Sequence, residues 1–146
     1  MIRISIYILI IVLVFTAPVT RIDVGTLRPV EVVAIHQENG ELILQTDTGD
    51  LGRGADVESA LRDMKQKTPA VIYLDTAKYL LVDINVQHDA EALRGYLKSN
   101  VKVALFCDRI DLKYAGMYLD VQDDLMAFED WKPGVLVTVL TSEKYF

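Results

Sequence analysis

Residues 27–47, LRPVEVVAIHQENGELILQTD, decide the fold of this chain, because they hold two apolar runs joined by a turn. The runs cover residues 27–37 and 41–47, and both are rich in Val, Ile and Leu. Asn39-Gly40 lies between them, and Asn-Gly between two strand-like runs is the strongest short-range sign of a β-hairpin. The sequence therefore predicts a hairpin here.

The rest of the chain alternates between helical and strand-like patterns. We expect residues 48–54 to form a glycine-rich loop, and Asp56 to cap a helix that ends at Thr68-Pro69. Further strands are predicted at 70–74, 79–82, 101–107 and 135–141, and further helices at about 89–98 and 111–121. The residues expected to face the core are Val57, Ala60, Leu61, Met64, Ala90, Leu93, Leu97, Leu112, Ala115 and Leu119. The alternation predicts an α/β (α+β) fold, a mixed β-sheet with an N-terminal hairpin and about three packed helices.

An apolar run without charges precedes this domain, at residues 4–19 (ISIYILIIVLVFTAPV). As a helix it would extend about 24 Å, against roughly 30 Å for the hydrocarbon core of a membrane, so it suits a signal sequence or a thin anchor. Cleavage is disfavoured because Pro18 follows Ala17, the one suitable site. We expect residues 1–22 to be an N-terminal membrane anchor or uncleaved signal that contains this apolar helix, and residues 23–146 to form a single small α/β domain. The alternative is a buried core strand, since Ile and Val favour sheets.

The net charge of the chain and its expected orientation in the membrane limit the kinds of molecule that it could bind. The net charge of −6 argues against nucleic acid, whose phosphates require clusters of Lys and Arg. Almost no chain precedes the apolar run, so we expect the domain to be extracytoplasmic. The predicted partners are the membrane, through residues 4–19, and a protein of the membrane or envelope.

Two segments are candidate contact surfaces for that protein. The first is the glycine-rich loop, with Gly49, Gly52, Arg53 and Gly54. The second lies between Tyr114 and Trp131, where five acidic residues occur without any Lys or Arg: Asp120, Asp123, Asp124, Glu129 and Asp130. A basic partner would suit the acidic segment, and the alternatives are a solvated acidic face or a weak calcium site.

Catalytic, metal and cofactor motifs are missing from the sequence, so we expect a protein that is not an enzyme and binds no cofactor. Gly52-Arg53-Gly54 lacks the third glycine of a dinucleotide-binding loop and the Lys-Ser/Thr of a phosphate loop. Neither CxxC nor HxxxH spacing occurs. Cys107, the single cysteine, ends an apolar run and is expected to be a small buried residue.

Two other functions stay open. Asp47-Thr48-Gly49 matches the triplet of aspartic proteases, which pair two carboxylates, so a hydrolase built on it would be a homodimer. A small-ligand sensor is the second possibility. Its pocket would lie at the carboxyl ends of strands, near Asp75, Thr76 and Asp108.

One segment, residues 52–82 (GRGADVESALRDMKQKTPAVIYLDTAKYLLV), carries a resemblance. It combines a glycine pair, an acid-x-Ala-Leu helix core, a Thr-Pro break and a Leu-Val run, at Gly52, Gly54, Glu58, Ala60, Leu61, Thr68, Pro69, Leu80, Leu81 and Val82. In this order it resembles the N-terminal domain of the Ger(x)C proteins, the C subunits of spore germinant receptors, and with the hairpin the likeness extends to about Cys107.

This chain departs from the Ger(x)C pattern in two ways. Members of that family are longer, with further domains, and are typically lipoproteins, whereas no cysteine near the apolar run of this chain could accept a lipid. The resemblance implies a membrane-tethered, non-catalytic domain in an envelope or spore-membrane complex that takes part in sporulation or germination. It assigns no ligand-binding residue.

Overall fold

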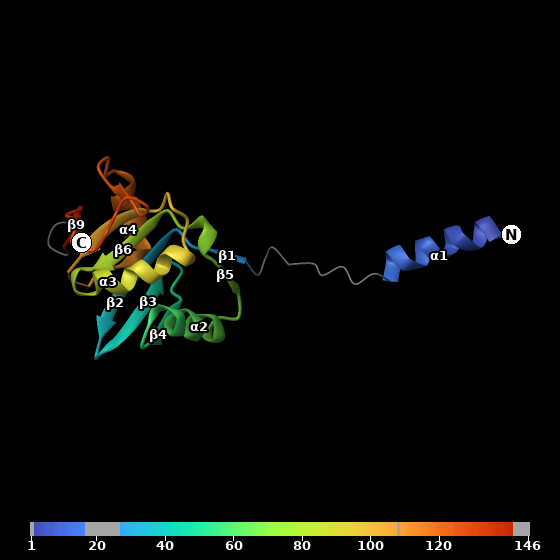
Figure 1. Cartoon of the computed structure of the whole chain (residues 1–146), viewed down its shortest axis with the longest axis horizontal. Coiled ribbons are helices and arrows are strands. Elements are labelled where there is room, and N and C mark those ends of the chain that lie inside the picture. Colours follow the sequence, from blue (N-terminus) through green and yellow to red (C-terminus); the bar gives the residue numbers. More distant parts are fainter. Residues whose placement is uncertain (1, 17–26, 108, 142–146) are drawn as a thin grey trace.

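The computed structural model describes residues 2–16, 27–107 and 109–141 (Figure 1). It is a mixed α/β fold in which helices pack against a mixed sheet, as the sequence predicted. The strands of the main sheet are β2 (Val32–Glu38), β3 (Glu41–Thr46), β4 (Leu51–Gly54), β6 (Tyr79–Asp83), β7 (Lys102–Phe106), β8 (Met126–Ala127) and β9 (Val139–Leu140).

The predicted hairpin is confirmed as β2 and β3, whose pairing begins at Glu38 and Glu41. Asn39 and Gly40 both have positive φ angles, 52° and 81°, as a two-residue hairpin turn of the primed type requires. β4 continues this meander on the outer side of β3. On the other side of β2, strands β6 and β7 run parallel to it, and β7 pairs with both β8 and β9.

Helices cover both faces of this sheet. One face packs against α2 (Val57–Lys67), α3 (Gln87–Ala90) and the 3-10 turn η4 (Glu91–Gly95), and the other packs against α4 (Leu112–Asp120). The carboxylate of Asp56 accepts a hydrogen bond from the backbone N–H of Ser59, so the predicted cap of α2 is confirmed. All ten residues predicted to face inward from the three helices are buried.

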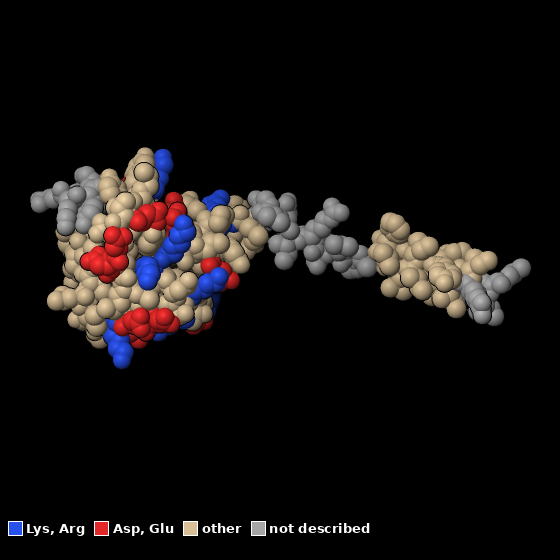
Figure 2. Space-filling model, turned by 90° about the horizontal axis from the view of Figure 1, so that it is seen from above, with Lys and Arg blue, Asp and Glu red and all other residues tan. Residues whose placement is uncertain are grey.

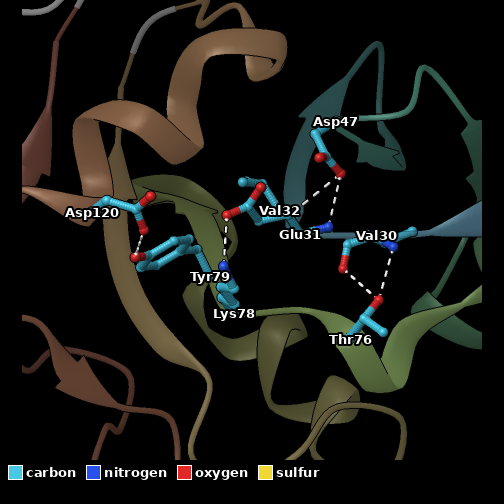
Figure 3. A network of polar contacts seen from close by, with 8 residues as sticks. All are labelled: Val30, Glu31, Val32, Asp47, Thr76, Lys78, Tyr79 and Asp120. Atoms are coloured by element: carbon cyan, nitrogen blue, oxygen red, sulfur yellow. Dashed lines mark hydrogen bonds and ion pairs between the residues drawn. The ribbon is translucent and has the colours of Figure 1, made fainter.

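The first predicted strand, residues 27–37, is in fact two strands in two sheets. β1 (Leu27–Pro29) pairs in parallel with β5 (Val71–Tyr73), and β2 begins three residues later, at Val32. Pro29 has no N–H for a ladder. The Oδ1 atom of Asp47 accepts hydrogen bonds from the next two backbone N–H groups, those of Glu31 (3.1 Å) and Val32 (3.2 Å) (Figure 3). The chain therefore bends from one sheet into the other.

Four further local predictions were wrong. The glycine-rich loop contains strand β4, and the helix expected at 89–98 tightens into the 3-10 turn η4 after Ala90. The last strand is confined to Val139–Leu140, where it pairs with β7. Cys107 is exposed, because β7 ends at Phe106 and the chain then leaves the sheet. Short 3-10 turns, η2 (Leu74–Thr76) and η3 (Ile84–Val86), follow β5 and β6.

The apolar N-terminal run forms helix α1 (Ile2–Thr16), which Figure 1 shows apart from the sheet and its helices. From Ile6 to Phe15 every side chain is apolar and between 51% and 85% exposed. The alternative of a buried core strand was therefore wrong. Within the parts of the chain that the structure describes, no helix is both long and apolar enough to span a membrane.

Candidate functional site

In the glycine-rich loop that was predicted as a contact surface, the glycines serve the fold: they form a turn and pack against a helix. Gly49, with a φ of +91°, closes the turn between β3 and β4, and its N–H donates to the carbonyl of Thr46. Within β4, a Cβ on Gly52 would lie 2.0 Å from the carbonyl oxygen of Ala60, and one on Gly54 would lie 2.6 Å from the nitrogen of Ala60. These two glycines therefore let α2 approach β4 closely, and their Cα faces toward α2 are closed to a partner.

Arg53, between those glycines, lies on the free edge of the sheet. Its backbone N–H donates to the Oδ2 atom of Asp63 (2.8 Å), and its guanidinium lies 3.9 Å from the carboxylate of Glu38. Because this backbone N–H points away from the sheet and already has a hydrogen-bond acceptor, it is not available to pair with a strand of another chain. Of the four predicted residues, Arg53 is thus the one that presents an extended side chain to solvent.

The predicted acidic residues lie at the carboxyl end of α4. Asp120 is the last residue of the helix, Asp123 and Asp124 follow it, and all three are exposed. The hydroxyl of Tyr79 donates a hydrogen bond to Asp120 (Figure 3), and burial together with this bond raises the pKa of Tyr79 to about 12. Asp120 is therefore fixed to the sheet, whereas Asp123 and Asp124 extend from the turn beyond it.

Next to these acids lies an apolar surface that we did not predict. α4 buries Leu112, Ala115 and Leu119, yet its outer side also carries large apolar residues. Those on the outer side are Tyr114, Met117, Tyr118 and Val121 at the end of the helix. Met117 is 71% exposed and Val121 is 73% exposed. The four positions follow the i, i+3, i+4, i+7 spacing of one helix face, so this second stripe could have been found in the sequence. We call it, with Asp120, Asp123 and Asp124, the α4 surface.

A second candidate site is a pocket of about 660 Å³ on the face of the sheet that α4 covers in part. Its floor comes from Ala34, Leu81 and Phe106, and the residues around the floor are His36, Gln37, Glu38, Gln45, Leu51, Asp83, Cys107, Arg109, Ile110 and Leu112. The chain leaves β6 toward α3 on one face and leaves β7 toward α4 on the other. In open α/β sheets, ligands bind at the carboxyl ends of strands where such connections diverge.

The polar groups of this pocket differ in their environments. Burial lowers the pKa of His36, although the charges of Asp83 and Glu38 oppose this shift. The ring of His36 meets the ring of Phe106 edge-on, with centroids 6.4 Å apart. Asp83 accepts hydrogen bonds from the backbone N–H (2.9 Å) and the side-chain amide (3.1 Å) of Asn85. The imidazole is therefore held neutral beside a carboxylate that is not ion-paired among the residues the structure describes.

Of the strand ends named for a ligand sensor, the one at Asp75 and Thr76 lies outside this pocket. Asp75 and Thr76 belong to η2, which follows β5. The hydroxyl of Thr76 accepts a hydrogen bond from the N–H of Val30 and donates one to the carbonyl of Val30 (2.9 Å each). Asp108 lies outside the described residues. Cys107 and Arg109, which flank Asp108 in the sequence, line the pocket, so the expectation named one of its strand ends, and ligand binding there stays a prediction.

Asp47, the residue on which the possible hydrolase depends, makes hydrogen bonds that stabilise the backbone around the start of β2. Its carboxylate holds the start of β2, and its backbone N–H donates to the carbonyl of Val32 (3.1 Å). The pairing of two such carboxylates in a dimer stays a prediction.

Among residues 2–16, 27–107 and 109–141, no group of three His, Cys, Asp or Glu residues is arranged to hold a metal ion. The comparisons with known proteins give no relative: no family model, no curated protein and no solved structure matches this chain.

Proposed function

We propose that this protein is a membrane-anchored, extracytoplasmic binding module without catalytic activity, which docks onto another membrane or envelope protein through the α4 surface. The observation that carries the proposal is the second apolar stripe of α4, which lies beside exposed acids on a helix whose first stripe is already buried. A large apolar patch with a polar rim is typical of protein interaction sites.

The anchor is assigned to α1 and the residues after it, 4–19. Residues 4–16 carry no Lys, Arg, Asp or Glu, and Figure 2 shows the helix without charged side chains there, in contrast to the domain. A helix that is apolar on every side is stable only when lipid or protein surrounds it. Burial of one Leu- or Ile-sized side chain stabilises by about 1.5–3 kcal/mol, so ten or more provide a driving force on the order of 20 kcal/mol.

The length of α1 suits a thin anchor. Its 15 residues extend about 22 Å, less than the roughly 30 Å of an average hydrocarbon core. A short apolar helix is accommodated by local thinning of the bilayer and by flanking residues that reach the headgroups. Residues 17–19, which continue the apolar run in the sequence, lie outside the described residues.

The chemistry of the α4 surface defines the partner. Tyr and Met are enriched at the centres of protein interfaces, and the i, i+3, i+4, i+7 spacing is how a helix presents anchors to an apolar groove. The acids at one end of the stripe favour Lys or Arg at the matching end of that groove. The partner is therefore an apolar groove with a basic rim, and the resemblance to Ger(x)C proteins would place it in a spore-membrane complex.

Photocrosslinking in the native membrane tests this proposal. A photoreactive amino acid replaces Met117, and the matched control carries it at Val71, an exposed apolar residue of β5 that is 54% exposed. We expect position 117 to crosslink to one partner protein, at a segment that contains Lys or Arg, and position 71 not to.

Charge removal makes the test specific. The double substitution D123N/D124N in the photoreactive chain should weaken the crosslink several-fold, because it removes two exposed carboxylates beside the stripe. Equal crosslinking from positions 117 and 71, or a crosslink that D123N/D124N leaves unchanged, would contradict the proposed docking mode.

A further inference from the structure

The pocket at the ends of β6 and β7 is open because α4 covers only part of its face of the sheet. Leu112, Ala115 and Leu119 of α4 pack over β2, β6 and β7, in the apolar cluster that includes Ala34 and Leu81. β3 and β4 extend the sheet away from this helix, and Gln45 and Leu51 from these strands line the pocket directly. The cavity is thus a consequence of the fold, because the sheet is wider than α4, the helix that packs on this face among the described residues.

Neighbouring strands align the side chains of this face in rows. Ala34 pairs with Leu81 in parallel register and with Gln45 in antiparallel register, so these three lie side by side. One step further along the strands, Asp83 pairs with Phe106, and His36 pairs with Ile43. The pocket therefore has one row of Gln45, Ala34 and Leu81, and beyond it a row that contains an imidazole, a carboxylate and an aromatic ring.

Acidic and basic residues both line the pocket, and Asp83 is the acidic one without an ion pair among the described residues. Glu38 and Asp83 are acidic and Arg109 is basic, while Glu38 is already paired with Arg53. Among the described contacts, Asp83 accepts hydrogen bonds from N–H groups of Asn85 and belongs to none of the ion pairs. A carboxylate at the edge of an apolar floor is best compensated by a cation that brings its own apolar body.

From this arrangement we propose that the pocket binds a small organic amine, with its ammonium group at Asp83 and its apolar body against Phe106 and the partly exposed Ile110. The ring of Phe106 would contribute a favourable contact with a positive charge at this place. This site is separate from the α4 surface, and the proposal does not depend on protein docking.

The other charges of the pocket are compatible with an amine. The lowered pKa of His36 keeps its ring neutral at neutral pH, so it does not repel a cation and can accept a hydrogen bond from it. Arg109 is an exposed residue beyond the end of β7. A ligand with a carboxylate would use Arg109 instead of Asp83, and this is the outcome that the test separates from the proposal.

Three probes of nearly equal size test which ligand charge the pocket prefers: benzylamine is a cation, benzyl alcohol is neutral and benzoate is an anion. The full chain in lipid nanodiscs is titrated with each by calorimetry, with empty nanodiscs as the blank. We expect benzylamine to bind about tenfold more tightly than the alcohol and the carboxylate, and the substitution Asp83→Asn to weaken benzylamine about tenfold. The control Asp75→Asn, which removes an exposed charge outside the pocket, should change the affinity less than about twofold.

A second measurement locates the ligand even if Asp83→Asn does not fold. The chain has two histidines, His36 in the pocket and His88 outside it, so their ring signals in NMR spectra are readily assigned. Benzylamine should shift the ring signals of His36 and leave those of His88 in place. Tighter binding of benzoate, equal binding of all three probes, no binding, or a shift at His88 alone would each overturn the proposal.

Discussion

Asp47 fixes the point where the chain passes from the small sheet into the large one. Its Oδ1 atom accepts from two successive backbone N–H groups, and Val32, which provides one of them, is buried. A buried N–H without a partner costs about 1–3 kcal/mol, so the domain depends on this carboxylate.

We expect Asp47→Ala to lower the free energy of unfolding by about 1–3 kcal/mol and Asp47→Asn to lower it less, because an amide oxygen can still accept. The fluorescence of Trp131, the single tryptophan and a fully buried one, reports unfolding of the domain in urea independently of α1. Asp124→Ala, at an exposed position, should change the stability by less than about 0.5 kcal/mol. Equal effects at 47 and 124 would refute the role of Asp47.

His36 makes the stability depend on pH. Burial lowers its pKa in the folded domain below the usual histidine value of about 6.5, so below that pH residue 36 binds more protons in the unfolded chain than in the folded one. Stability should therefore fall as the pH decreases from 6.5 through the lower folded pKa, and His36→Gln should reduce this fall. NMR titration should show His36 titrating below pH 6.5, and Asp83→Asn should lower its pKa further, since Asp83 raises it. An unshifted His36 would be the contrary result.

At the scale of elements, the contact between β4 and α2 explains the glycine pair. β4 lies so close to the helix that a Cβ at Gly52 would overlap the Ala60 carbonyl oxygen. Leu42, Leu44 and Met64 are buried in the same cluster. The position of α2 over the hairpin therefore requires a residue without a side chain at position 52.

Gly52→Ala should destabilise the domain by about 1–3 kcal/mol or more, because backbone must move to accommodate the methyl group. The matched control is Gly95→Ala, since a Cβ there meets nothing within 4 Å and the φ angle is not positive. Urea unfolding followed by Trp131 fluorescence compares the two variants. If Gly52→Ala were as stable as Gly95→Ala, the close approach of α2 to β4 would be incorrect.

Periodicity located the helices and the inner strands, because their patterns are local. The Asn-Gly turn, the Asp56 cap and the inward faces of three helices could all be predicted from neighbouring residues. β4 could not, since its glycines are typical of a loop and only the position of α2 explains them. The pairing of β1 with β5 could not either, because it depends on Asp47 and Thr76 from distant parts of the chain.

The two candidate sites also differ in how far they could be predicted from the sequence. Asp120, Asp123 and Asp124 could be selected from composition, and the apolar stripe beside them follows a helical spacing that the sequence displays. The pocket was located only in part, through Asp108 after β7, because its groups come from the ends of β2, β6 and β7. Their register places His36, Asp83 and Phe106 together only in the folded sheet.

At the scale of the whole molecule, the chain combines an apolar helix with a domain whose surface mixes both signs of charge. On the face of the domain that Figure 2 shows, acidic and basic side chains lie beside one another in small groups. The exposed apolar residues of the domain include the α4 stripe, whereas those of α1 extend around the helix. These two apolar surfaces differ in shape. We assign lipid as the surroundings of α1, and a groove on a partner protein as the binding site of the α4 surface.

Spin labels in lipid bilayers test the anchored-module account most directly. In a Cys107→Ser background, one nitroxide is attached at Leu9→Cys in α1 and another at Leu136→Cys, a domain position that is 90% exposed. We predict that oxygen, which concentrates in lipid, relaxes the label at position 9 while a water-soluble nickel complex does not reach it, and that position 136 shows the reverse. Equal access of the nickel complex to both positions would contradict the account.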